Sequence, residues 1–409
     1  MQQLDKNIIK KAIKKAENHI EQLSDYRDLC LFGGFLDKLY YKLLYCNEIK
    51  DKENLFYNYF QQIYSEFSKG KTAFNFAGIV GILWVSNILY EKKIIIKENF
   101  KVDNNLQNLI LDTAIKLQTN NLYDLFSGSI GNVNAVLSIA NNLNKEQEKL
   151  IIEYLKTLEK TAESVKDCDG YKWISYYFAK KEYVYNLSLS HGIASIVALL
   201  CKTLEKCSCY NSEIKEYSER IIRKAINYIL SNEIDFEKYK SHFPNLCVDY
   251  YNDKKLYGSR LAWCYGDLGI AYTFLRAALI LDDTALLNKS TSILLDCTKR
   301  IDYTENNIFD PWFCHGTCGI AYIFKKIYEK TNIEDFNISA NFWLSETINM
   351  LNTNYKDYIF NKNPNLKKDF FKDKNVSNTI IEGYTGIAMV LRSFLNTDNC
   401  EWEQFFLLN

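Results

Sequence analysis

The feature that most constrains the fold of this chain is a short glycine motif that recurs along it. Three copies are nearly identical: Gly266-Asp-Leu-Gly269-Ile-Ala-Tyr272, Gly316-Thr-Cys-Gly319-Ile-Ala-Tyr322 and Gly383-Tyr-Thr-Gly386-Ile-Ala-Met389. Weaker copies precede them, around Gly34, Gly81, Gly131 and Gly192. A motif that returns at long intervals is typical of a repeat fold.

The spacing of the copies predicts that each repeat is a pair of helices. We take Gly34 and Gly192 as second glycines of the motif, like Gly269. Neighbouring copies then lie 47 to 77 residues apart, which is enough for two helices and their loops. After the glycine, apolar residues continue at helical spacing, while stretches such as 214–230 supply amphipathic partners. Strand signals are sparse throughout.

Seven such hairpins can stack in an open solenoid or close into a ring. We expect the ring, because the helix predicted at 78–89 is apolar nearly all round and must be covered on every side. The sequence therefore predicts an all-α fold: an α/α toroid of seven inner and seven outer helices, formed by a single domain over residues 1–409. A loop-rich insertion is expected at about 232–260, where a lid, a peptide groove and a variable surface loop are the alternatives.

The first 25 residues or so predict an amphipathic helix rather than a secretion signal. Apolar residues recur there at helical spacing among lysines, at Leu4, Ile8, Ile9, Ala12, Ile13, Ala16 and Ile20. No apolar run in the chain approaches the roughly 20 residues of a membrane-spanning helix. We therefore expect a cytoplasmic protein.

The charge and the cysteine content of the chain indicate which binding partners and which cellular compartment to expect. Fifty Lys plus Arg balance fifty Asp plus Glu, so no overall basic field favours nucleic acid as a partner. The twelve cysteines suggest disulfides, but a cytoplasmic chain of this length would keep its thiols reduced. For Cys30, Cys46, Cys201, Cys297 and Cys400 we expect a packing role, and we assign none to Cys207 and Cys209.

Three residues near successive copies of the motif form a candidate metal site. Cys264 and the adjacent pair Cys314 and His315 lie just before a repeat glycine, so a closed ring would bring them to one end. Two thiolates and one imidazole suit zinc, and three protein ligands with one open position are typical of a catalytic site. From spacing alone, packing thiols and a structural histidine are an equal alternative. Cys318 is a conceivable fourth ligand, although its place in the repeat favours packing.

Four short segments together resemble the signatures of the lanthionine synthetase C-like family, the lantibiotic cyclases. They are Tyr123-Asp124-Leu-Phe-Ser-Gly128, Ser-His191-Gly, Arg260-Leu-Ala-Trp-Cys264-Tyr265-Gly and Cys314-His315-Gly. The resemblance runs from about Leu31 to Asn409. It implies an α/α toroid in which Cys264, Cys314 and His315 bind Zn²⁺. It also implies that His191, Asp124, Arg260 and Tyr265 line the active site.

The resemblance implies an enzyme that adds peptide cysteine thiols to dehydroalanine or dehydrobutyrine and so closes (methyl)lanthionine rings. Its implied partners are a dehydrated precursor peptide with its leader, together with a dehydratase and an ABC exporter at the inner face of the membrane. In this reading His191 is the acid and Asp124 holds its ring, although a helix N-cap is an equal alternative for Asp124. A relative that adds glutathione or binds thiols, and a non-catalytic helical scaffold, are the alternative functions.

Overall fold

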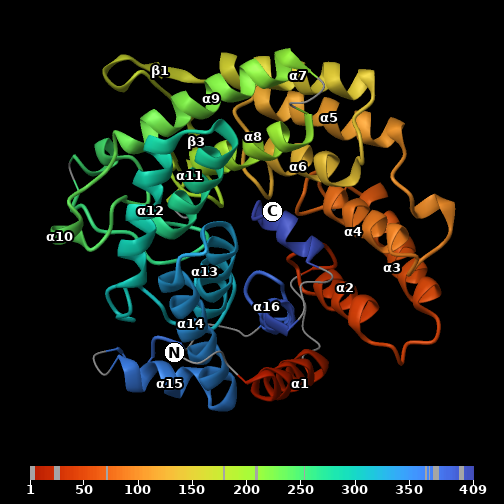
Figure 1. Cartoon of the computed structure of the whole chain (residues 1–409). Helices are drawn as coiled ribbons and strands as arrows, with labels where there is room; N and C mark the ends of the chain where they lie inside the picture. Colours follow the sequence, from red (N-terminus) through yellow and green to blue (C-terminus); the bar gives the residue numbers. More distant parts are fainter. Residues whose placement is uncertain are drawn as a thin grey trace.

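The computed structural model describes residues 5–22, 28–70, 72–177, 180–207, 211–252, 254–363, 366–367, 369–371, 377–395 and 400–409. Within them, seven helices form an inner layer around the centre of the molecule (Figure 1). They are α2 (Phe35–Tyr45), α4 (Ile79–Glu91), α6 (Ser129–Ile139), α8 (Ile193–Cys207), α11 (Asp267–Leu281), α13 (Thr317–Thr331) and α16 (Tyr384–Leu395).

Seven further helices lie outside these. They are α1 (Lys6–Gln22), α3 (Lys52–Ser68), α5 (Asn104–Thr119), α7 (Lys145–Lys160), α9 (Ser212–Leu230), α12 (Thr284–Thr298) and α14 (Glu334–Asn352). Each inner helix contacts the next around the ring, and the last, α16, contacts α2. The predicted α/α toroid is confirmed, while the assignment of residues 1–409 to a single domain stays a prediction.

The two layers differ in how their helices begin. Outer helices such as α5 and α7 start at Asp103 and Asn144, whose side chains accept hydrogen bonds from backbone N–H groups of the first turn. Inner helices such as α6 start at a glycine without a side-chain cap, and ten of the eleven residues of α6 are buried. A glycine is required because the chain six residues upstream passes against it. A Cβ at Gly316 would lie 2.3 Å from the Asp310 carbonyl oxygen.

The register assumed for two copies of the motif is wrong. Gly34 and Gly192 directly precede α2 and α8, as Gly266 precedes α11, so they are first glycines rather than second ones. The packing agrees, because a Cβ at Gly192 would lie 2.3 Å from the backbone oxygen of Asn186, again six residues upstream. The second-glycine position of the first copy is therefore Asp37. The intervals calculated for these two copies were shifted by three residues.

Asp37 joins the first repeat to the last. Its Oδ1 accepts a 2.7 Å hydrogen bond from the backbone N–H of Ile380, and its Oδ2 accepts one of 3.1 Å from Gly34. Burial raises the pKa of this carboxyl to about 7, although both backbone N–H groups favour the ionised form. The ring closure thus rests in part on a fully buried acid.

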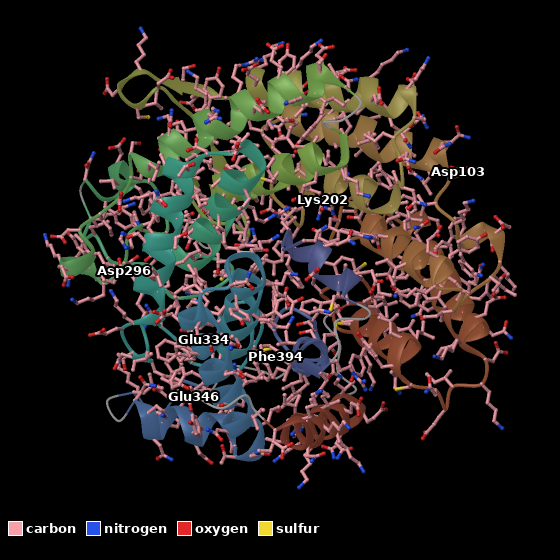
Figure 2. The ribbon with its side chains drawn as sticks, in the orientation of Figure 1. Asp103, Lys202, Asp296, Glu334, Glu346 and Phe394 are labelled. Carbon is pink, nitrogen blue, oxygen red and sulfur yellow. The ribbon has the colours of Figure 1, made fainter. Side chains whose placement is uncertain are left out.

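The segment around η4 (Glu401–Phe406) fills the middle of the ring, where Figure 1 shows the end of the chain. Trp402, Phe405 and Phe406 are completely buried. Tyr272 of α11 donates to the Leu408 carbonyl, and the buried amine of Lys202 on α8, labelled in Figure 2, donates to Asn134 and faces Gln404. The centre of the toroid is therefore filled by the side chains around η4 rather than open.

Two insertions interrupt the pairs of helices. The first contains η2 (Lys166–Cys168) and two short antiparallel hairpins, which the sequence did not predict: β1 (Glu163–Val165) with β2 (Gly170–Lys172), and β3 (Ser175–Tyr177) with β4 (Glu182–Val184). The second is the expected stretch at 232–260, whose regular elements in the described residues 232–252 and 254–260 are α10 (Phe236–Tyr239) and η3 (Val248–Tyr251). The remaining short helices are η1 (Glu98–Phe100) and α15 (Tyr355–Lys362).

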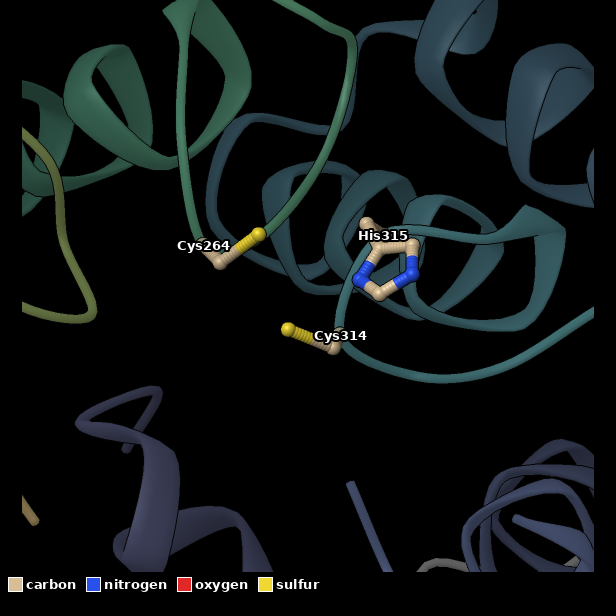
Figure 3. A group of neighbouring side chains, drawn as sticks. All are labelled: Cys264, Cys314 and His315. Carbon is tan, nitrogen blue, oxygen red and sulfur yellow. The ribbon is translucent and has the colours of Figure 1, made fainter. Parts of the chain in front are cut away.

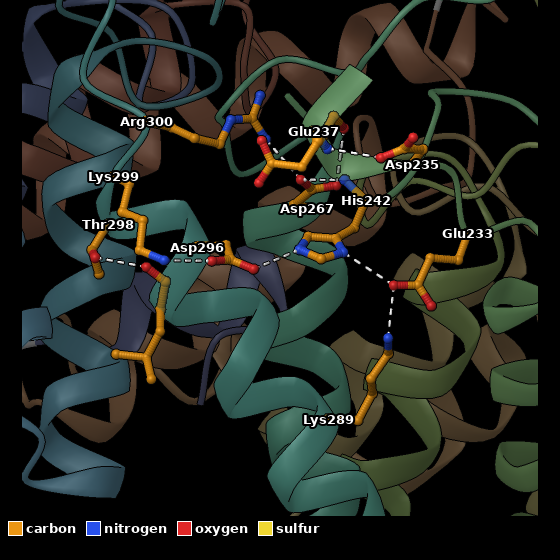
Figure 4. Close-up of polar contacts among 12 residues, drawn as sticks. Glu233, Asp235, Glu237, His242, Asp267, Lys289, Asp296, Thr298, Lys299 and Arg300 are labelled. Atoms are coloured by element: carbon orange, nitrogen blue, oxygen red, sulfur yellow. Dashed lines mark hydrogen bonds and ion pairs between the residues drawn. The ribbon is translucent and has the colours of Figure 1, made fainter. Parts of the chain in front are cut away.

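The second insertion is held to the ring by polar contacts (Figure 4). His242 lies between Glu233 and Asp296 of α12, with ring nitrogens 3.0 and 3.1 Å from their carboxylate oxygens. Asp267, at the start of α11, accepts backbone hydrogen bonds from His242 and Phe243 and binds Arg300 at 2.8 Å. These contacts anchor the insertion to the start of α11 and to α12.

The N-terminal helix and the cysteines largely follow the expectations. The predicted amphipathic helix is present as α1, in which Ile9, Ala12, Ile13, Ala16 and Ile20 are buried, whereas Ile8 is 44% exposed and lies outside the buried face. Leu4 and Cys209 lie outside the described residues. The cysteines of the described part are all free, with Cys46 and Cys400 only half-buried. No helix in the described ranges is long and apolar enough to cross a membrane.

Candidate functional site

The loops that precede the inner helices are joined to one another at one end of the ring. The backbone N–H of Ser190 donates to the Cys264 carbonyl at 3.3 Å, and that of Cys264 donates to the Cys314 carbonyl at 3.3 Å. Cys314 in turn donates to Ile381 at 2.8 Å. Each of these residues stands two places before a helix-starting glycine. The repeat therefore places Cys264 and Cys314 side by side through their backbones.

Cys264, Cys314 and His315 form a compact group of possible metal ligands (Figure 3). Their ligand atoms all lie within 4.8 Å of one another. Cys264 is buried and the other two are partly buried. Cys318 is fully buried elsewhere, with its Sγ 4.0 Å from the Gly386 carbonyl oxygen, so it packs and does not join the group. Two sulfurs and one imidazole nitrogen at this spacing fit a tetrahedral zinc ion with one position open.

Asp310 fixes which nitrogen of His315 is available to a metal. Its Oδ2 lies 3.0 Å from Nε2 of the ring, so Nδ1 is the nitrogen left for the two cysteines. Burial opposes a charge on this ring, but Asp310 and Cys264 together raise the pKa of His315 to about 10. The carboxylate partner is the usual arrangement for a histidine that binds zinc.

The thiols are held in an environment that favours ionisation of one of them. Burial alone would raise the pKa of Cys264, yet hydrogen bonds from Cys314 and His315 lower it well below the usual value. The same bond to Cys264 raises the pKa of Cys314. The positive charge of Arg260 favours the thiolate form of both. Without a metal, the pair therefore shares its negative charge unequally.

Arg260 lies in an irregular segment, since α11 begins only at Asp267. It is therefore not one helical turn before Cys264, as a helical reading of that segment would require. Within the described ranges, its side chain forms no ion pair with an acid. Its positive charge favours the thiolate form of Cys264 and Cys314.

Asp124 and His191 are in direct contact, although 67 residues separate them. Oδ2 of Asp124 lies 2.5 Å from Nδ1 of His191. Burial alone would lower the pKa of His191, but the charge and hydrogen bond of Asp124 raise it above the usual value. Burial would likewise raise the pKa of Asp124, and His191 lowers it instead. The contact leaves Nε2 of His191 for other partners.

The alternative of a helix N-cap is wrong for Asp124, because Gly128 directly precedes α6, but the second oxygen of Asp124 does bind backbone N–H groups. Oδ1 accepts hydrogen bonds from the backbone N–H groups of Phe126 and Ser127, each at 2.8 Å. These hydrogen bonds close the turn that leads into α6, while the helix itself starts after Gly128. The turn therefore fixes the carboxylate that orients His191.

Tyr265 is positioned by Asn186, whose side-chain amide donates to the phenol oxygen at 3.1 Å. Burial raises the pKa of Tyr265, so the phenol stays neutral at ordinary pH. The rings of Tyr265 and His191 have centroids 6.1 Å apart. Both side chains line a cavity of about 400 Å³, which also contacts Asp124. The four residues expected at the active site thus fall into two neighbouring groups. Asp124, His191 and Tyr265 line the cavity, and Arg260 acts on the candidate metal ligands.

Sequence reasoning missed three residues of the site: Asp310, Asn186 and Glu382. Asp310, Asn186 and Arg260 all stand six places before a helix-starting glycine. Glu382, whose charge acts on Cys314, stands directly before Gly383, as His191 and His315 stand before theirs. Once the copies are aligned by the glycine that starts each helix, the equivalent positions of these residues are a signal that could have identified them in the sequence.

The model of the family described as "Lanthionine synthetase C-like protein" matches residues 38–407, which is most of the chain. The chain belongs to the lanthionine synthetase C-like family. This lanthionine synthetase C-like protein is 24% identical over 226 residues to "Nisin biosynthesis protein NisC" of Lactococcus lactis subsp. lactis. The match covers 52% of this chain and 48% of NisC, so the chain spans about half the length of the curated relative it matches.

Among solved structures, the lanthionine synthetase C-like chain is similar to "Nisin cyclase" with a TM-score of 0.68 and 21% identity. That likeness covers 99% of this chain and 98% of the other. At this level of identity it shows that the two share the toroid fold.

Proposed function

We propose that this protein is a zinc-dependent cyclase that forms (methyl)lanthionine thioether rings in a dehydrated lantibiotic precursor peptide. The observation that carries the proposal is the grouping of Cys264, Cys314 and His315 at the same end of the ring as the Asp124–His191 pair. Membership of the lanthionine synthetase C-like family supports it, as does the similarity to a nisin biosynthesis protein and to a nisin cyclase.

Cys264, Cys314 and His315 would hold the zinc, and Asp310 would keep the His315 ring oriented toward it. A free peptide thiol has a pKa near 8.5 and is only a few per cent thiolate at pH 7, and zinc bound here would stabilise it as the thiolate. Arg260 balances part of the negative charge that the two cysteines bring to the centre. Holding the thiol and alkene in contact supplies further acceleration.

The addition needs a proton donor for one carbon. The sulfur forms a bond to the β-carbon of the dehydrated residue while the C=C π bond breaks, so an electron pair moves to the α-carbon and its carbonyl. That carbon then takes a proton, and the thiol has lost one, so the peptide's composition is unchanged. His191 is the acid that gives this proton, because Asp124 favours its protonated form and leaves Nε2 free to donate.

Tyr265 orients the carbonyl of the dehydrated residue by donating from its phenol. Asn186 donates to the same phenol oxygen, so the phenol hydrogen is left for the peptide. As enolate charge develops on that carbonyl, the hydrogen bond becomes stronger, which is the kind of stabilisation that accelerates a reaction.

The substrate's chemistry implies the partners. Dehydroalanine and dehydrobutyrine must come from the dehydration of serine and threonine, so a dehydratase acts before this protein. We extend the proposal to a leader-bearing peptide, a cytoplasmic reaction, and an ABC exporter that takes the product at the inner face of the membrane.

Cyclisation of a dehydrated peptide tests the proposal. Because the reaction leaves the mass unchanged, each ring is counted as one thiol that no longer reacts with an alkylating reagent. Wild-type protein should consume thiols, and Cys314→Ala and His191→Ala should slow this by at least about 100-fold. Consumption of glutathione by the same alkene, without ring closure, would instead support the glutathione-adding alternative.

A further inference from the structure

The cavity beside His191 and Tyr265 extends to a part of the molecule that the proposed chemistry does not use. It has a volume of about 400 Å³, within the range of pockets that bind small ligands. Cys264, Cys314 and His315 do not line it, so it is a separate compartment that shares His191 and Tyr265 with the reaction centre. Strand β3 contributes Ser175, Tyr176 and Tyr177 to its wall.

The lining of this compartment favours apolar side chains. Four tyrosines, Tyr123, Tyr176, Tyr177 and Tyr265, line it together with Leu122. The charged groups among its lining residues are Asp124 and His191, and these two are paired with each other. A charged peptide side chain would therefore lose its water without gaining a partner, whereas an aromatic one would gain contact with several rings.

The β3–β4 hairpin is held firmly as one wall of the cavity. Tyr176 pairs with Tyr183 across the strands, and their rings pack edge to face at 5.3 Å. Glu182 of β4 accepts a hydrogen bond from Tyr250 of η3, which ties the hairpin to the second insertion. Trp173, just before the hairpin, is fully buried and donates to the Leu158 carbonyl at 2.8 Å.

Tyr176 and Tyr177 both line this wall but differ in how far they are exposed. Tyr176 is 37% exposed, so it stands at the mouth of the cavity. Tyr177 is half-buried and lines the cavity together with Tyr265. The hairpin therefore presents an exposed tyrosine and a half-buried one to the cavity.

We infer that this cavity is a subsite for an apolar or aromatic side chain next to the dehydrated residue, and that Tyr176 and Tyr177 determine that preference. The inference rests on the proposed function, since it places the alkene between the metal centre and the cavity. A thiol held at Cys264, Cys314 and His315 would approach the alkene from one side. The neighbouring side chain would enter the hairpin's compartment on the other.

The test uses two sets of three synthetic peptides, each peptide with one cysteine and one dehydroalanine. The three peptides of a set carry Phe, Gly or Asp next to the dehydroalanine, directly before it in one set and directly after it in the other. Wild-type protein should cyclise the Phe peptide with a kcat/KM about tenfold above that of the Gly peptide, with the Asp peptide lowest. Tyr176→Ala and Tyr177→Ala should each bring the ratio of Phe to Gly close to one. Tyr257→Ala is the matched control, because Tyr257 is a tyrosine of the second insertion that is 59% exposed and does not line the cavity, and it should keep the ratio.

A wild-type ratio near one on both sides, or an equal loss of preference in Tyr257→Ala, would overturn the subsite. Binding of the same peptides with alanine in place of dehydroalanine, measured by fluorescence anisotropy, separates this from failure of the proposed function. If no peptide is cyclised but the Phe peptide binds more tightly and Tyr177→Ala removes the difference, the subsite is supported and the cyclase proposal fails. Equal binding of all three peptides overturns the subsite whatever the activity.

Discussion

Oδ2 of Asp124 lies 2.5 Å from Nδ1 of His191, while Oδ1 of the same carboxylate closes the turn before α6. The backbone of one repeat thus determines the orientation and the charge of a histidine in the next. This relationship makes the acid role of His191 testable through pH.

Asp124→Asn should move the alkaline limb of the pH profile to lower pH. The wild-type carboxylate raises the pKa of His191, so removal of its charge lowers that pKa and the protonated acid is lost earlier as pH rises. The profile of kcat/KM against pH measures this. Ser127→Ala is the control, because it removes a hydrogen bond to Asp124 but keeps the charge, and its limb should stay in place. An unmoved limb in Asp124→Asn would exclude His191 as the acid.

Asp310→Asn should weaken zinc binding by about 10 to 100-fold. The carboxylate 3.0 Å from Nε2 orients the His315 ring and increases its basicity, which an amide does less well. Competition with a chromogenic chelator gives the affinity directly. Asp283→Asn, at the cap of outer helix α12, removes a carboxylate elsewhere and should bind zinc like the wild type. Equal affinities for both variants would contradict the positioning role.

Asp37→Asn should change how stability depends on pH. Asp37 has a folded pKa of about 7, against about 3.9 in an unfolded chain. Its contribution to stability is therefore full below pH 3.9 or so and is lost as pH rises through 7, by up to a few kcal/mol. The Tm of wild type should fall relative to the variant between pH 5 and pH 8, as measured by calorimetry. A constant difference between the two would show that Asp37 does not titrate in this range.

Trp402→Ala should lower the free energy of unfolding by about 3 to 5 kcal/mol, because the ring is fully buried at the centre of the toroid and its removal leaves a cavity. Chemical denaturation measures the loss. Tyr64→Ala, which removes an aromatic ring that is 64% exposed on α3, should cost less than about 1 kcal/mol. Similar losses for both would mean that the central segment contributes little to holding the ring together.

The sequence predicted the parts of the fold that depend on local pattern. Glycines such as Gly266 and Gly316 mark the start of inner helices because nothing larger fits against the preceding loop. The convergence of Cys264, Cys314 and His315 followed from their equivalent places in the repeat, once a closed ring was assumed. Their role as zinc ligands, like the catalytic roles, stays a prediction.

Features that depend on contacts between distant segments could not be predicted in this way. Strands β3 and β4 have three residues each, too few to show a period of two. The bond between Asp37 and Ile380 spans 343 residues and exists only because the ring closes. Asn186 was missed because the fourth copy was aligned three residues out of register, whereas Asp310 precedes a copy that was aligned correctly and was missed because its contact with His315 is seen only in the fold. Aligning the copies by the glycine that starts each helix removes that error.

Zinc content of the purified protein, measured by elemental analysis, tests the central claim most directly. The wild type is compared with Cys264→Ala, Cys314→Ala and Cys318→Ala, where the last removes a buried thiol of α13 that lies outside the group. About one zinc per chain in the wild type and in Cys318→Ala, lost in the other two, is the result that the account predicts. Zinc absent from the wild type, or retained in both Cys264→Ala and Cys314→Ala, would contradict it.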